Sequence, residues 1–180
     1  VGVLGLVTPN IPGWEQPEHY RGLAFLPMDE VAREQIRLLR ETEGCDLVVV
    51  LAHTGFEKDL DDGAASGTEI EDFGWRLAQI PGIDVLLTGH THRDIPPRDL
   101  NGTIVSQPRA RAHLLTRIDL EFELRDGGWR LTSWEGRNLT LDGVIAPPLE
   151  ERLRAIDGAA PDALRQAAAL LLASPEYQMA

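Results

Sequence analysis

The chain has 180 residues, enough for one medium domain with a hydrophobic core, and its 43% apolar and 26% charged residues are typical of a globular protein. The formal net charge of −12 argues against binding to a nucleic acid duplex through a general basic surface. No stretch approaches the roughly 18 consecutive apolar residues that a bilayer-spanning helix needs, so the sequence predicts no membrane span.

The first part of the chain combines apolar strands with one amphipathic helix. Residues 1–7 predict a buried strand, and a proline-rich loop follows them. Residues 23–26 predict a short strand. Residues 31–43 predict a helix with Asp29 as a plausible N-cap. Apolar side chains recur along one face of this helix at positions Ala32, Ile36 and Leu39.

The middle of the chain repeats the strand and helix pattern. Residues 46–52 and 83–87 are apolar runs that predict buried strands. Residues 68–79 between them predict a helix, in which Thr68 and Glu71 have the spacing of a capping box. Strands that alternate with helices predict parallel strands joined by crossover helices, and therefore an α/β fold.

The pattern changes after residue 92. Residues 103–106 predict a short strand, and residues 114–124 and 129–141 alternate in hydropathy around an Asp-Gly-Gly turn at 126–128. This arrangement predicts a β-hairpin. Helical patterns return after residue 147. The second half therefore adds antiparallel strands, which suggests a layered sandwich with a mixed second sheet.

Three of the five histidines come shortly after the two predicted strands at 46–52 and 83–87. His53 ends the strand at 46–52, whereas His90 and His92 follow the strand at 83–87. The carboxyl ends of parallel strands are where open α/β sheets bind ligands, and imidazole is a common metal ligand. A lone histidine in such a loop is usually structural. A His-x-His pair on an extended segment points to opposite faces, so it converges only if the turn bends it or if two metals take one histidine each.

The residues around these histidines resemble a known family. Residues 52–55 (Ala-His-Thr-Gly) and 87–92 (Leu-Thr-Gly-His-Thr-His) are similar to the last two metal motifs of the calcineurin-like metallophosphoesterases. The similarity is greatest to the branch of 5′-nucleotidases and 2′,3′-cyclic-nucleotide 2′-phosphodiesterases. The segments 5–14, 80–84 and 104–108 are similar to the same branch.

The resemblance implies a partial fold. Residues 1–142 would form the C-terminal half of a metallophosphoesterase domain, a partial four-layer α/β/β/α sandwich. Residues 143–180 would follow as a helical linker or tail. The family's first three motifs, Asp-x-His, Gly-Asp and Gly-Asn-His, are absent from this sequence. A missing N-terminal half of the same domain is therefore the expected partner.

The resemblance also implies a site. His53 and His90 would bind one metal and His92 the other, in a centre of two divalent ions such as Zn, Mn, Fe or Co. No catalytic residue of the family falls within this chain. Arg109, Arg111 and His113 follow the last of these segments, where family members usually have glycines. Arg109 and Arg111 could bind the substrate phosphate, since arginine binds phosphate bidentately, or could be solvent-facing turn residues. His113 is expected on the substrate side.

The predicted function is hydrolysis of phosphoesters in nucleotides or cyclic nucleotides, in a centre of which this chain holds fewer than half the ligands. The chain alone is expected to be inactive. One alternative is a non-catalytic binding module on the same scaffold. Another is a single-metal hydrolase that uses His53, His90 and His92 with water as the fourth ligand. Relatives in this branch are mostly exported, so the resemblance implies a periplasmic, secreted or cell-surface location.

Overall fold

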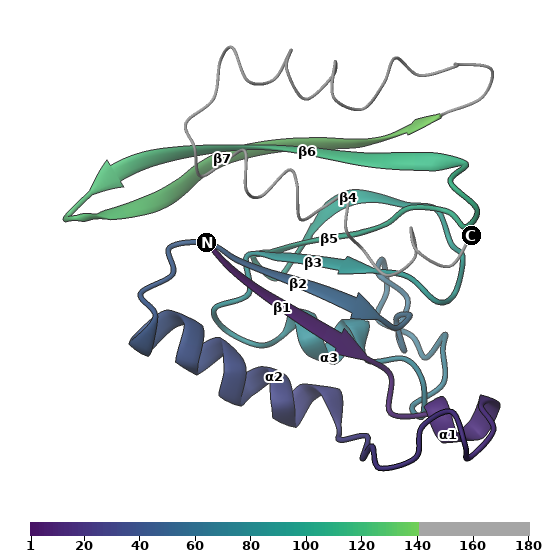
Figure 1. Ribbon diagram of the computed structural model, residues 1–180. Helices are drawn as coiled ribbons and strands as arrows, with labels where there is room; N and C mark the ends of the chain where they lie inside the picture. Colours follow the sequence, from purple (N-terminus) through teal and green to yellow (C-terminus); the bar gives the residue numbers. More distant parts are fainter. Residues whose placement is uncertain (141–180) are drawn as a thin grey trace, which may run out of the picture.

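The computed structural model describes residues 1–140 (Figure 1). The predicted boundary at 142 and the predicted helical tail at 143–180 lie outside the described residues. Among residues 1–140, none of the helices combines the length and the hydropathy that a membrane crossing requires.

A five-stranded sheet forms the centre of the fold, with the strand order β1-β2-β3-β5-β4. Strands β1, β2, β3 and β5 run parallel, and β4 is antiparallel to β5 at the edge. The strands are β1 (Gly2–Val7), β2 (Val48–His53), β3 (Val85–Thr88), β4 (Ile95–Leu100) and β5 (Thr103–Gln107). Apolar and β-branched side chains dominate β2 and β3, as expected for parallel strands covered on both faces.

Helices cover one face of this sheet, and Figure 1 shows α2 and α3 together on that side. The helical segments are α1 (Ile11–Trp14), α2 (Met28–Arg37), the π-helical turn η1 (Leu38–Thr42) and α3 (Gly74–Ala78). Ala32 and Ile36 of α2 are buried against this face, and Leu39 packs on the same core. The apolar stripe predicted for this helix is therefore confirmed.

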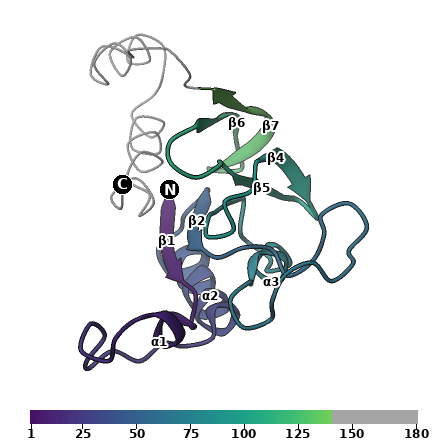
Figure 2. The ribbon, with the colours of Figure 1, turned by 90° about the vertical axis from the view of Figure 1, so that its right-hand side faces the viewer.

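A long hairpin covers the other face, as Figure 2 shows from the side. It consists of β6 (Leu114–Arg125) and β7 (Gly128–Thr140), paired antiparallel. Asp126 and Gly127 both have positive φ, 52° and 82°, the combination that a two-residue type I′ turn requires. The predicted hairpin is confirmed. Side chains from the hairpin pack against the sheet at Ile118, Leu120, Phe122, Leu131 and Trp134.

The described residues thus form three layers: helices, a mixed sheet and a two-stranded hairpin. The mixed α/β class with a parallel sheet is confirmed. The four-layer arrangement stays a prediction. Alternate residues of β2 divide between the two cores, with Val48 and Val50 facing the helices and Val49 facing the hairpin.

Some predicted elements differ from the structure. The predicted strand at 23–26 is wrong, because that segment pairs with no strand in the described chain and leaves Leu23 65% exposed. The helix predicted at 31–43 begins at Met28, so Asp29 lies in its first turn and is not its N-cap. Strand β4 was not predicted, because its two prolines are tolerated only at a sheet edge.

The helix predicted at 68–79 shortens to the five residues of α3. Residues 69–71 form a turn in its place, although Glu71 N does donate to Thr68 Oγ1 across 3.3 Å. The reciprocal bond of a capping box comes from Asp72, whose Oδ2 accepts from Thr68 N at 2.7 Å. Glu71 is therefore not used as a helix cap, and its side chain points elsewhere.

Candidate functional site

Polar residues gather where the parallel strands end. Register pairs Val7 with His53 across β1 and β2, and Ala52 with Thr88 across β2 and β3. In Figure 1 the arrowheads of these three strands point to the same edge, and α1 lies beyond the end of β1. The predicted histidine segments therefore reach one edge of one sheet.

His53 and His90 lie next to each other at this edge. Their ring centroids are 5.2 Å apart with an angle of 60° between the planes. Both residues are half-buried. The backbone brings them together through Gly89 N, which donates to Thr54 O across 3.3 Å and ties the loop after β3 to the end of β2.

The His-x-His segment is bent rather than extended. His90 and His92 have φ values of 66° and 56°, in the left-handed region that histidine tolerates better than most residues. Thr91 N donates to Gly89 O across 2.7 Å within this turn. His92 is exposed. Only a bent segment allows the rings of His90 and His92 to face one site.

Gln107 holds this turn from the neighbouring strand. Its Oε1 accepts from Thr91 Oγ1 at 3.0 Å and from Thr88 Oγ1 at 3.5 Å, and the residue is fully buried. Gln107 Nε2 is a buried donor for which the described residues supply no acceptor. The loop that carries His90 is therefore anchored by a side chain at the end of β5.

Glu71 adds a carboxylate to the site. Its Oε2 lies 3.1 Å from His90 Nε2, and its Oε1 accepts from Asn10 Nδ2 at 2.7 Å and from Trp14 Nε1 at 3.3 Å. The hydrogen bond from His90 is the main reason why the pKa of the Glu71 carboxyl lies below its ordinary value. Sequence reasoning missed this role because Glu71 fits a local capping pattern. The adjacent Asp72, four residues after Thr68, was the one signal that another carboxylate could take the cap.

Trp14 covers the imidazole of His90. The two rings stack with centroids 5.0 Å apart and planes 23° apart, and Trp14 remains 43% exposed. Trp14 therefore forms part of the wall of the site.

The three residues expected on the substrate side lie after β5, between Gln107 and β6. Arg109, Arg111 and His113 are all exposed there, and Arg111 has a left-handed φ of 62°. This turn leaves the sheet at the same edge as the histidines. The contacts that join His53, His90 and Glu71 do not include these three residues, and their role stays a prediction.

The donor types at this edge suit a divalent transition metal. Neutral imidazole and carboxylate are ligands for Zn, Mn, Fe and Co, and His53, His90 and Glu71 supply both. Residues 1–140 nevertheless contain no group of three or more His, Cys, Asp or Glu side chains that could hold a metal ion. The donor types at this edge therefore suit a divalent ion, but the described residues form no complete metal site.

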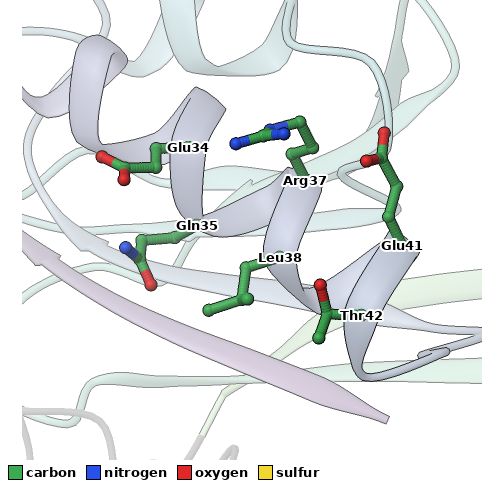
Figure 3. Close-up of a pocket in the computed structure, with 6 residues that line it drawn as sticks. All are labelled: Glu34, Gln35, Arg37, Leu38, Glu41 and Thr42. Carbon is green, nitrogen blue, oxygen red and sulfur yellow. The ribbon is translucent and has the colours of Figure 1, made fainter.

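A separate shallow hollow of about 120 Å³ lies on α2 and η1. Figure 3 shows the six lining residues, which all come from that helical segment: Glu34, Gln35, Arg37, Leu38, Glu41 and Thr42. It contains neither a histidine nor a strand end. The candidate site is therefore the sheet edge and not this hollow.

Proteins of similar sequence include nucleotide phosphoesterases. The trifunctional nucleotide phosphoesterase protein YfkN of Bacillus subtilis is 28% identical over 158 residues, which cover 81% of this chain and 10% of YfkN. A 2′,3′-cyclic-nucleotide 2′-phosphodiesterase/3′-nucleotidase of Salmonella typhimurium is 28% identical over 73% of this chain and 22% of its own length. No protein-family model matches the chain.

Solved structures match the fold as well. The crystal structure of the calcineurin-like phosphoesterase YfkN aligns with a TM-score of 0.68 and 27% identity, over 87% of this chain and 49% of that structure. The chain thus spans less than half the length of each relative described. The predicted resemblance is confirmed: the homologues of this chain are nucleotide phosphoesterases and calcineurin-like phosphoesterases.

Proposed function

We propose that this chain supplies part of the active site of a metal-dependent phosphoester hydrolase that acts on nucleotides or cyclic nucleotides. The observation that carries the proposal is the pair of imidazoles, His53 and His90, 5.2 Å apart at the carboxyl edge of the sheet. The homologues are named as nucleotide phosphoesterases, which supports an enzyme of this kind.

The residues of this chain would hold metal in the way that the resemblance implies. His53 and His90 would hold one divalent ion, and His92 would hold a second. A bound ion of this kind would lower the pKa of a coordinated water toward about 7 and so would supply a nucleophile at neutral pH. Arg109 and Arg111 bind phosphate oxygens from the adjacent turn, where arginine is well suited to bidentate contact. His113 lies with them on the substrate side.

The chain by itself is proposed to be a weak metal binder with negligible activity. Three imidazoles are fewer than half of the ligands that a dinuclear centre needs, and residues 1–140 hold no complete set. The remaining ligands would come from the other half of the same domain. We also propose an extracytoplasmic location, which rests on the resemblance.

A non-catalytic binding module on the same scaffold is the second candidate. The observation that favours it is the incomplete set of metal donors in residues 1–140. The two candidates differ in what the histidines do. A hydrolase fragment should still bind a divalent ion through them, whereas a binding module has no need to.

Calorimetric titration of the chain with Mn²⁺ or Zn²⁺ tests the choice. We expect weak binding that His53→Ala and His90→Ala each reduce by at least about tenfold, since each removes a ligand. His19→Ala is the matched control, because His19 is exposed and pairs with Glu15. Equal binding by all four proteins would exclude the proposed centre, as would hydrolysis of a nucleotide that His90→Ala leaves unchanged.

A further inference from the structure

The Glu71 carboxylate collects three side-chain contacts from different parts of the chain. Asn10 and Trp14 come from the segment after β1, and His90 comes from the loop after β3. An ionised carboxylate can only accept hydrogen bonds. The hydrogen bond to Glu71 Oε2 therefore requires a proton on His90 Nε2.

The backbone under Glu71 is held in place. Glu71 O accepts from Thr54 Oγ1 at 2.7 Å, and the same hydroxyl accepts from Phe73 N at 2.8 Å. Thr54 is fully buried and directly follows His53. The carboxylate is thus placed from the end of β2, the strand that also carries the other imidazole of the site.

One face of the His90 ring is covered by Trp14. The indole stacks on the imidazole at 5.0 Å, and its Nε1 is tied to the same carboxylate that contacts the imidazole. Rotation of the His90 ring would have to break the hydrogen bond and the stacking together. The Glu71 carboxylate therefore restrains both the His90 ring and the Trp14 indole that stacks on it.

We propose that Glu71 is a positioning residue that fixes His90 as the Nε2-protonated tautomer and holds Trp14 against its ring. Any metal that His90 binds would then be bound through Nδ1. Carboxylates that accept from the second nitrogen of a histidine ligand fix its tautomer and orientation in this way. The metal part of this inference rests on the proposed function, whereas the tautomer does not.

Nitrogen-15 NMR of the imidazole side chains of the full chain tests the proposal without metal. At pH about 8, above the ordinary histidine pKa of about 6.5, His90 should show protonated Nε2 and unprotonated Nδ1. Glu71→Gln should mix the two tautomers and shift the Trp14 indole N–H signal. Glu69→Gln, on an exposed neighbouring side chain, should change neither signal.

Several outcomes would overturn the proposal. Protonated Nδ1 in the unmodified chain would do so without any variant, even if Glu71→Gln fails to fold. A folded Glu71→Gln variant with unchanged His90 and Trp14 signals would do so as well. Zn²⁺ titration provides a second test. The metal should perturb the Nδ1 signal of His90, and Glu71→Gln should weaken the affinity of the chain for Zn²⁺ about 10- to 100-fold. A locked tautomer in a chain that binds no Zn²⁺ would support the positioning role and refute the proposed metal centre.

Discussion

The hydroxyl of Thr54 accepts a hydrogen bond from the backbone amide of Phe73 across 2.8 Å, and this contact joins the end of β2 to the turn before α3. Thr54 is fully buried, and Phe73 is 5% exposed. Water therefore cannot replace the hydroxyl if it is removed.

Thr54→Val should destabilise the fold by roughly 1–3 kcal/mol, because it leaves a buried amide without an acceptor. The size and branching of the side chain are kept, so the loss reports the hydrogen bonds. Urea unfolding followed by circular dichroism measures the change. Thr132→Val, at an exposed position of β7, should change the free energy of unfolding by less than about 0.5 kcal/mol. Equal effects of the two substitutions would contradict this account.

Arg40 connects the segments that precede β2 and β3, at the end of the sheet away from the histidines. Its guanidinium donates to Gly82 O at 2.9 Å, to Cys45 O and Asp46 O at 2.8 Å each, and to the carboxylate of Asp84. Asp84 Oδ2 also accepts from Val48 N at 2.6 Å. Asp84 precedes β3, so it lies at the opposite end of the strand from the histidines.

Arg40→Lys should therefore destabilise the chain by roughly 1–3 kcal/mol although the charge is kept, since an ammonium group cannot reproduce the planar set of donors. Arg37→Lys, on an exposed residue of the same helical segment, provides the matched control and should be nearly neutral. The midpoints of urea unfolding compare the two variants. A neutral Arg40→Lys variant would show that these contacts contribute little.

The location of the histidines could be predicted from the sequence, whereas their carboxylate partner could not. His53 and His90 each follow an apolar run, and parallel strands end at a common edge, so their proximity follows from topology alone. Glu71 lies 19 residues before His90 in the chain, and its local pattern fits a helix cap equally well. Only the packing of the turn against Thr54 decides between the two roles.

One edge strand of the sheet, β4, was also beyond prediction. Strand β4 carries Pro96 and Pro97, which argue against a strand unless it lies at an edge with a free side. Its place beside β5 depends on contacts with the hairpin as well as on its own sequence. Local propensity therefore identified β1 at the other edge of the sheet but not β4.

Gly55 occupies a position at which a side chain has no room. A Cβ atom there would overlap Asp72 Oδ1 and Thr91 Cγ2, which belong to the turn before α3 and the histidine loop. Gly55→Ala should destabilise the fold by about 1–3 kcal/mol through overpacking and should shift the NMR signals of His90. Gly5→Ala is the matched control, since no heavy atom lies within 4 Å of its Cβ position. Similar melting temperatures for the two variants would contradict the steric argument.

The loop around Asp59 should respond to acid. Asp59 Oδ1 accepts from Asp61 N at 2.8 Å and from Asp62 N at 3.4 Å, and these backbone hydrogen bonds hold the pKa of Asp59 below its ordinary value of 3.8. The folded loop thus favours the ionised carboxyl, so the contribution to stability is present above pH 3.8 and is lost as the pH falls through the lower folded pKa. Carbon-13 NMR titration of the Asp59 carboxyl should give a midpoint below 3.8, and Asp59→Asn should remove the pH-dependent shift of the Asp61 amide signal. A midpoint at or above the ordinary value would show that these amides do not bind the carboxylate in solution.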